Sequence, residues 1–188
     1  GFRNSELKTV NHSELFPQSI PQGVLILGLC GSLSPEYSVG DALLYRGCYS
    51  LERDFLATDS QLTETIYRQL QQQVSLVKGL TSDRPICQAQ EKLHLSQKYS
   101  TQVVDMEGHG YLQLLQTRGI AVTILRVVSD DCLYDIPNLE GVIDHGKLNS
   151  GKLAVAMLRQ PIPAIRLITG SLTGLKTLQK ITNNLVRS

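Results

Sequence analysis

Short, mostly apolar runs alternate with amphipathic stretches along most of the chain. Glycine or polar residues bound each run, a pattern that is typical of strands buried on both faces, as in a parallel sheet. The predicted strands cover residues 23–29, 42–49, 74–80, 102–105 and 121–128.

Helical signals occupy the segments between these runs. Asp59 and Ser60 form an expected N-cap, and Leu62, Ile66 and Leu70 fall on one face of the helix that follows. Strands that alternate with helices predict the α/β class with a largely parallel sheet. Further helices are predicted at residues 89–99, 108–118, 150–159 and 163–186, the last with an apolar stripe recurring every three or four positions.

Length and composition indicate one domain that spans residues 1–188. Of the 188 residues, 41% are hydrophobic and 19% are charged, so intrinsic disorder is not expected. Residues 1–22 are poorly patterned, and residues 146–188 form a basic helical tail. No apolar run reaches the roughly 18 residues that a membrane span needs, and no signal peptide opens the sequence.

The cysteines and histidines indicate neither a disulfide framework nor a metal centre. The four cysteines are widely spaced and form no CxxC pair, which favours a reducing cytoplasm. The four histidines lack HExxH or a similar ligand spacing. We therefore expect a cytoplasmic protein without a bound metal.

The net charge of +1 hides a strong asymmetry along the chain. Residues 1–145 carry 11 basic and 17 acidic side chains, a net charge of −6, whereas residues 146–188 carry seven basic residues and no acid. This division indicates a polyanionic or membrane-surface partner, or a tail that folds against its own acidic body. A solvated helix face is the simpler alternative.

Ligands in α/β folds usually bind beyond the carboxyl ends of the strands, so residues there are the first candidates for chemistry. One candidate is a loop expected at Gly28, Leu29, Cys30 and Gly31, where glycine permits tight turns and close approach to a ligand. Its spacing is neither GxGxxG nor that of a P-loop, which disfavours a dinucleotide-binding protein. A glycine turn after a strand is also common for structural reasons alone.

Glu107 follows a predicted strand and begins a predicted helix. A helix N-terminus stabilises an ionised carboxylate, which accepts two hydrogen bonds from vicinal hydroxyls such as those of a ribose. The alternative is a simple acid at a helix start. Met106 beside it is more often a core residue than part of a ligand site.

Asp130 ends the most apolar of the predicted strands, directly after Ser129. Partial burial would raise its pKa, so that it could hold a proton and deliver it to a leaving group. Asp131 could serve the same role, whereas Asp135 is less well placed. A capping role for Asp130 is the structural alternative.

Four stretches of the chain match a known family in the same order: ILGLCGSLSPEYSVGDALL (26–44), GLTSDRPI (79–86), VVDMEG (103–108) and AVTILRVVSDD (121–131). Together they resemble the purine nucleoside phosphorylase and nucleosidase superfamily, which includes the 5′-methylthioadenosine/S-adenosylhomocysteine nucleosidases. The pairing of a Met-Glu dipeptide with a later RxxSD sequence is the most specific part of the resemblance. The tail is similar to that of the hopanoid-associated phosphorylase-like proteins, which are linked to cleavage of adenine from adenosylhopane.

The resemblance implies a three-layer αβα fold and cleavage of an N-glycosidic bond. Asp130 would protonate N7 of a departing purine, and Glu107 would bind the ribose hydroxyls above Met106. Ile86 and Ser129 would border the base, and residues 28–31 would lie near the sugar or the nucleophile. An acid at the base and an anion at the ribose would stabilise both ends of an oxocarbenium-like transition state.

The sequence departs from the family pattern before and within its first predicted strand. Family members carry a strand and a helix before the glycine-containing segment, whereas a short, unpatterned segment precedes Gly23 here. The resemblance therefore implies a chain that lacks the usual N-terminal strand, because it is truncated, lacks disordered pieces or has lost that part. Leu29 stands where the family often has Ser, and Ile26 lies near the position of an Arg in hexameric phosphorylases. These departures favour water over phosphate as the nucleophile.

The expected activity is thus hydrolysis or phosphorolysis of an adenosine-type nucleoside with a 5′ substituent. No cofactor is expected, and inorganic phosphate remains a candidate co-substrate. A nucleoside-binding module of the same fold that has lost catalysis is the alternative. The expected partners are a small-molecule nucleoside, a neighbouring subunit of a homo-oligomer, and a membrane surface contacted by the basic tail, but no nucleic acid.

Overall fold

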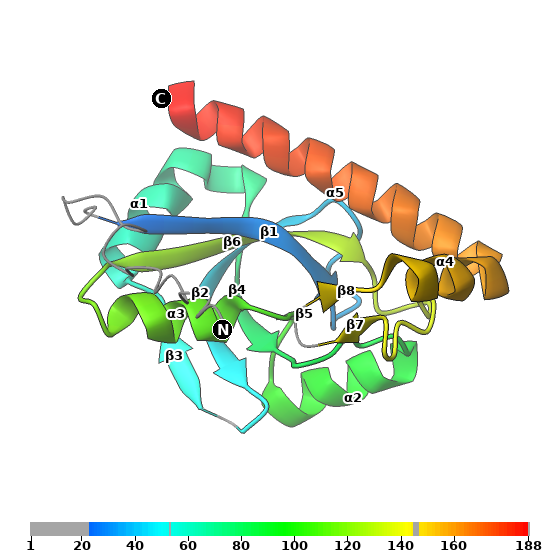
Figure 1. The fold of residues 1–188 in the computed structure, drawn as a ribbon. Coiled ribbons are helices and arrows are strands. Elements are labelled where there is room, and N and C mark those ends of the chain that lie inside the picture. Colours follow the sequence, from blue (N-terminus) through cyan, green and yellow to red (C-terminus); the bar gives the residue numbers. More distant parts are fainter. Residues whose placement is uncertain (1–22, 53, 145–146, 188) are drawn as a thin grey trace, which may run out of the picture.

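The computed structural model describes residues 23–52, 54–144 and 147–187, so the unpatterned segment 1–22 lies outside the described residues. The chain order is strand-rich at the start and helical at the end (Figure 1). The strands are β1 (Val24–Ser32), β2 (Ala42–Ser50), β3 (Phe55–Ala57), β4 (Ser75–Thr81), β5 (Val103–Asp105), β6 (Val122–Asp130), β7 (Ile143–Asp144) and β8 (Lys147–Leu148). The helices are α1 (Ser60–Leu70), the short 3₁₀ helix η2 (Gln71–Gln73), α2 (Ala89–Tyr99), α3 (Gly108–Gln116), α4 (Ser150–Arg159) and α5 (Pro161–Arg187).

The main sheet has the strand order β3-β2-β4-β5-β1-β6, and β2 also pairs with β6. This extra pairing closes five of the strands into a barrel, with β3 attached at its side. The pairs β1–β6, β2–β4 and β4–β5 are parallel, whereas β1–β5, β2–β6 and β2–β3 are antiparallel. The predicted α/β class with a mixed sheet is confirmed, but the closure of the sheet was not predicted.

An irregularity in β2 accompanies the closure. The register between β2 and β4 shifts between Tyr45 and Gly47, so that Arg46 has no partner on β4. An extra residue of this kind bends a strand and increases its twist. The bent strand pairs through its first residues with β6 and along most of its length with β4.

Helices cover the sheet on two sides (Figure 1). The long helix α5 packs on β6 and β1 and touches α1, while α3 packs on β2, β4 and β6 from the other side. Apolar residues of α1, α5 and the outward faces of β1, β2 and β6 form one core cluster. The predicted three-layer arrangement is therefore present, with a curled sheet as the middle layer.

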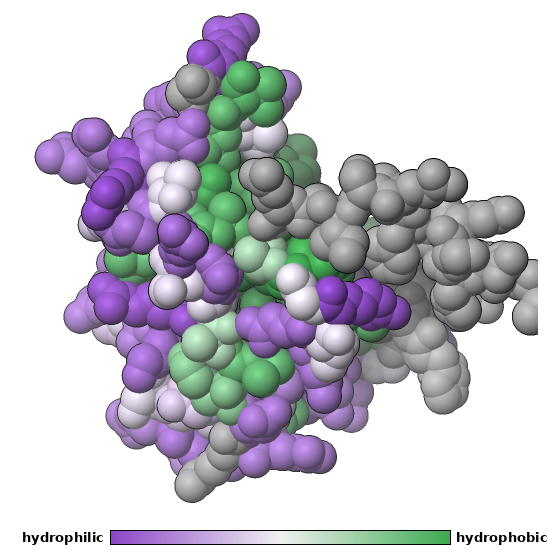
Figure 2. All heavy atoms as spheres, turned by 90° about the vertical axis from the view of Figure 1, so that its left-hand side faces the viewer, coloured by the Kyte–Doolittle hydropathy of each residue, from purple (hydrophilic) through white to green (hydrophobic). Residues whose placement is uncertain are grey.

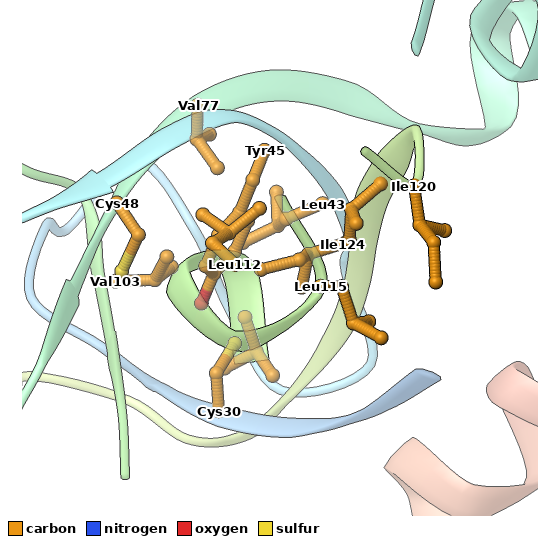
Figure 3. Packing of buried hydrophobic residues seen from close by; sticks show 12 residues of the cluster. Cys30, Leu43, Tyr45, Cys48, Val77, Val103, Leu112, Leu115, Ile120 and Ile124 are labelled. Carbon is orange, nitrogen blue, oxygen red and sulfur yellow. The ribbon is translucent and has the colours of Figure 1, made fainter. Parts of the chain in front are cut away.

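A second cluster fills the space between the barrel and α3. Figure 3 shows Cys30, Tyr45, Leu112 and Ile124 among the side chains of this cluster. Side chains alternate along a strand, so the residues of β6 that share a face with Ile124 are Val122, Arg126, Val128 and Asp130. One face of β6 therefore supplies both core residues and charged residues.

The strand β1 extends further than predicted and includes the segment expected to be a loop. Gly28, Leu29 and Cys30 pair in parallel with β6, and Gly31 pairs with Asp130 after a register shift. A side chain at Gly28 would overlap the guanidinium of Arg126 on the neighbouring strand. The glycine is thus explained by space for Arg126, and the loop prediction was wrong.

The surface mixes polar and apolar areas. On the side shown in Figure 2, hydrophobic residues form a band between hydrophilic ones. Within the described parts of the chain, no helix combines the length and the apolar character needed to cross a bilayer.

Candidate active site

A pocket of about 260 Å³ lies where β5 and β6 end and α3 begins. Glu107 is the N-cap residue of α3, and Asp130 is the last residue of β6. Both line this pocket, together with seven other residues that the sequence singled out or that flank them: Leu29, Cys30, Gly31, Ile86, Asp105, Met106 and Ser129. Of the residues that the sequence analysis assigned to the site, only Gly28 is not part of this lining. The alternative acids Asp131 and Asp135 line a neighbouring pocket instead.

Asp130 is held by polar groups on both carboxylate oxygens. The Nζ of Lys92 donates a hydrogen bond to Oδ2, and Ser129 Oγ donates to Oδ1 at 2.8 Å. Lys92 also donates to the carbonyl oxygen of Asp131 at 2.7 Å. A side chain at Gly31 would come within 2.8 Å of Asp130 Oδ2, so glycine leaves room for the carboxylate.

The Lys92–Asp130 pair changes the expected chemistry of the site. The Lys92 side chain is completely buried and that of Asp130 is mostly buried. A buried ammonium stabilises an ionised carboxylate, because neither charge has bulk water to compensate it. The sequence argument considered only the partial burial of Asp130, and the structure adds a buried cationic partner.

Glu107 reaches the pocket from the start of α3. Its carboxylate is about half exposed and makes no capping hydrogen bond with the helix. Oε2 lies 3.5 Å from Nη2 of Arg126, which is buried. The Glu107 oxygens can therefore accept hydrogen bonds from groups in the pocket or from solvent.

Arg126 and Asp105 form a buried ion pair beneath Glu107. Arg126 Nε donates to Asp105 Oδ2 at 3.0 Å, and Asp105 Oδ1 accepts from Thr81 Oγ1 at 2.7 Å and from the backbone N–H of Gly108 at 3.0 Å. Burial opposes the guanidinium charge, but Asp105, Tyr45 and Glu107 outweigh it and raise the pKa of Arg126.

One nitrogen of Arg126 has no hydrogen bond. Nη2 is buried, lies beside Glu107, and has no hydrogen-bond partner within the described residues. A buried donor without a partner costs free energy, so Nη2 is available to donate a hydrogen bond to an acceptor in the site.

Cys30 lines the same pocket as the two acids, and it is not suited to nucleophilic chemistry. Burial raises the pKa of Cys30 well above the ordinary value of 9.0, and the charges of Asp105 and Asp130 raise it further. A thiolate is the reactive form of cysteine, so Cys30 is an inert core residue at neutral pH.

A second pocket, of about 290 Å³, adjoins the first. The two share Ser129, Asp130, Ile136 and Leu167 in their linings. The second is bounded by α5, which approaches so closely at Gly170 that any side chain there would overlap the backbone of Ser129. The two acids therefore face a space that continues toward α5.

Sequence reasoning did not assign Lys92 or Arg126 to the site. Arg126 interrupts an otherwise apolar run, and a lone charge in such a strand signals a buried partner. Lys92 gives no comparable signal, because α2 carries several polar residues and only the tertiary structure shows which of them is buried. In the described part of the chain, no cluster of three or more His, Cys, Asp or Glu side chains is arranged to hold a metal ion.

The described fold is an α/β barrel with a pocket beyond the ends of β5 and β6, lined by Glu107 and Asp130. The chain belongs to the phosphorylase superfamily, whose family model matches residues 12–159. No curated protein sequence matches the chain.

Solved structures with related folds include futalosine hydrolase of Helicobacter pylori, with a TM-score of 0.65 and 17% identity over 88% of this chain and 68% of that one. The 5′-methylthioadenosine/S-adenosylhomocysteine nucleosidase of H. pylori matches with a TM-score of 0.59 and 18% identity over 86% of this chain and 68% of that one. The corresponding nucleosidase of Campylobacter jejuni matches with a TM-score of 0.55 and 17% identity over 85% and 69%. This chain therefore spans about two thirds of the length of these proteins.

Proposed function

We propose that the chain binds an adenosine-type nucleoside with a 5′ substituent and cleaves its N-glycosidic bond. The observation that supports this most is that Glu107 and Asp130, from separate segments, line one pocket. The names of the related structures, a futalosine hydrolase and two nucleosidases, agree with a nucleoside substrate. The membership in the phosphorylase superfamily agrees with cleavage at the glycosidic carbon.

Each wall of the pocket has a role in this proposal. Glu107 accepts hydrogen bonds from the ribose hydroxyls, and Met106 packs beneath the sugar. Ile86 and Ser129 border the base and place its N7 near Asp130. The adjoining pocket against α5 has room for the 5′ substituent. An adenosylhopane-type substituent stays one candidate for this group.

In the proposed reaction, the Lys92–Asp130 pair supplies the proton that the leaving base takes up. As the bond between the sugar and the base breaks, its electron pair moves to the base and N7 becomes more basic. A proton passes from Lys92 through Asp130 to N7, so the base leaves in neutral form. The proton that the attacking water loses then returns through Asp130, which lines the pocket, to the buried amine of Lys92.

Arg126 has a supporting role beneath the sugar. It holds Asp105 and lies 3.5 Å from Glu107, so its charge attracts the ribose-binding carboxylate. The charge of Glu107 near the sugar stabilises the cationic character that develops there. Water is the proposed nucleophile, with inorganic phosphate as the competing candidate.

One observation favours the alternative of a binding module without catalysis. Both carboxylate oxygens of Asp130 accept hydrogen bonds, from Lys92 and from Ser129, so neither oxygen is placed as a donor to the base. If the proton does not move within the pair, the site binds a nucleoside and releases no base. This alternative differs from the enzyme only in turnover.

Chromatographic detection of free adenine tests the proposal. The protein is incubated with 5′-methylthioadenosine and with adenosine, each with and without phosphate. Adenine release without phosphate supports hydrolysis, and release that requires phosphate identifies phosphorolysis. Calorimetric binding without adenine release supports the binding module, and the absence of both contradicts the proposed site.

A further inference from the structure

The helix α5 has an apolar face that no described part of the chain covers. Five aliphatic residues recur at intervals of three or four positions along it, and each is at least half exposed: Ile162, Ile165, Ile168, Leu172 and Leu175. Residues at this spacing lie on one face of a helix. We refer to these five residues as the α5 stripe.

The α5 stripe is separate from the face that packs on the barrel. The buried residues of α5 are Ala164, Gly170, Gly174 and Ile181, and the helix contacts β6, β1, α1 and α4. The helix is thus apolar on two faces. Packing within the chain accounts for one of them, and contiguous exposed apolar residues usually mark an interaction surface.

Basic residues accompany the α5 stripe. Arg166 and Lys176 lie one helical turn from Ile162 and Leu172, respectively, and both are exposed. No acidic residue follows Asp144 in the sequence. Among the described residues, none of the exposed basic side chains of α4 and α5 forms a salt bridge with an acid, namely Lys152, Arg159, Arg166, Lys176, Lys180 and Arg187.

We propose that α5 docks the protein on an anionic lipid surface, with the α5 stripe entering the boundary between headgroups and acyl chains. A helix with exposed aliphatic residues and adjacent Lys and Arg side chains lies in the plane of such a surface. The 27 residues of α5 give a helix about 40 Å long, which provides an extended line of contact. The described helices are not suited to cross the bilayer, so the contact is peripheral.

The combination of basic and apolar residues favours an anionic membrane over a nucleic acid or a second copy of the chain. A nucleic acid would neutralise the basic residues but offers no apolar layer for the α5 stripe. A second copy of the chain, paired symmetrically through the same face, would bring basic residues close to basic residues without an acid from this segment. Like charges at an interface oppose association, whereas an anionic membrane satisfies both features.

Co-sedimentation with lipid vesicles tests the proposal directly. The full chain is mixed with vesicles of phosphatidylcholine alone or of phosphatidylcholine and phosphatidylglycerol, at low and at high salt. We expect binding to the anionic vesicles at low salt, weaker binding at high salt because charges are screened, and little binding to phosphatidylcholine alone.

Paired variants separate the two contributions to binding. The Ile168→Gln/Leu172→Gln variant should weaken binding about tenfold or more, because two aliphatic side chains no longer leave water. The Lys176→Gln/Lys180→Gln variant should weaken it roughly fivefold for each lysine removed. Matched controls on other exposed surfaces, Tyr111→Gln/Leu114→Gln and Arg46→Gln/Lys98→Gln, should bind like the unaltered protein.

Three results would overturn the proposal. The first is an absence of binding to anionic vesicles at low salt, and the second is an equal loss of binding in the control variants. The third is a dimer in analytical ultracentrifugation that the Ile168→Gln/Leu172→Gln variant converts to monomers, because the α5 stripe would then be covered by a second copy. A dimer that persists in this variant uses another surface and agrees with the proposal.

Discussion

Lys92 of α2 donates a hydrogen bond to Asp130 at the end of β6, and the lysine side chain is completely buried. The pair joins a helix that sequence reasoning placed outside the site to the residue proposed as the acid. It also makes the position of α2 part of the geometry of the pocket. Stability and chemistry should therefore respond together to changes in this pair.

Removal of the lysine alone should be strongly destabilising. In Lys92→Met, the carboxylate of Asp130 remains mostly buried without its cation, and the loss of one partner of a buried pair typically costs about 3–5 kcal/mol. Urea denaturation measures the change. The double variant Lys92→Met/Asp130→Asn should recover part of the loss, because no charge is left uncompensated.

A lysine on the same helix provides the control for this prediction. Lys98 is exposed, so Lys98→Met should change the free energy of unfolding by about 0.5 kcal/mol or less. Equal destabilisation by the two single variants would show that the Lys92–Asp130 pair has no special contribution.

The contribution of Glu107 to nucleoside affinity should depend on the presence of the ribose 2′-hydroxyl. Glu107→Gln should weaken nucleoside binding about 10- to 100-fold, because a hydrogen bond to a charged acceptor contributes roughly 1.5–3 kcal/mol. 2′-Deoxyadenosine should bind the unaltered protein with a similar loss relative to adenosine. Calorimetry on the four combinations should show that the two losses do not add.

The surface variant Glu64→Gln, in an exposed pair with Arg68, should leave nucleoside affinity unchanged. Additive losses for Glu107→Gln and the missing hydroxyl would mean that this carboxylate does not contact the ribose at that position.

Replacing glycine by alanine should change the stability of the protein in opposite directions at two positions. Gly28→Ala would force a methyl group against the guanidinium of Arg126, and overpacking of this kind costs about 1–3 kcal/mol. Gly110 in α3 has nothing within 4 Å of an added Cβ, so Gly110→Ala should stabilise the protein by up to about 1 kcal/mol. Thermal unfolding of the two variants checks both signs, and a stabilised Gly28→Ala protein would contradict the role of this glycine.

Stability should fall at alkaline pH. Burial raises the pKa of Cys30 above 9.0 and the pKa of Tyr45 above 10.0. A group whose pKa is higher in the folded state stabilises that state fully below its unfolded pKa. The contribution is lost as pH rises, because the unfolded chain releases the proton first.

Each of these groups should therefore lower stability by up to about 1.4 kcal/mol per pH unit above its unfolded pKa. Urea denaturation between about pH 8 and about pH 10.5 measures the slope. The slope should be smaller in Cys30→Ala, whatever the effect of this substitution at neutral pH. An identical slope would show that the thiol of Cys30 ionises equally in both states.

Much of the secondary structure could be predicted because the buried strands and the amphipathic helices have distinct periods. The predicted strand at residues 121–128 corresponds to β6 (Val122–Asp130), and the predicted helix at 89–99 coincides with α2. β3, β7 and β8 have only two or three residues each. None of these three strands was predicted, whereas β5, which is as short as β3, was.

The tertiary features could not be predicted from one sequence. Closure of the barrel depends on pairing between β2 and β6, which lie far apart in the chain. Gly28 was interpreted as a loop residue because glycine favours turns, whereas its neighbour across the sheet explains it. Lys92 is one of two lysines on α2, and only the folded structure shows which one is buried.

The release of adenine by Asp130→Asn and by Asp131→Asn tests the central claim most directly. The two residues are adjacent, and only the side chain of Asp130 pairs with Lys92. With 5′-methylthioadenosine as substrate, we predict that Asp130→Asn lowers the rate of adenine release by about 10²- to 10⁴-fold while nucleoside binding remains measurable. Asp131→Asn should stay within a few fold of the unaltered protein. Unchanged turnover in Asp130→Asn would contradict the account.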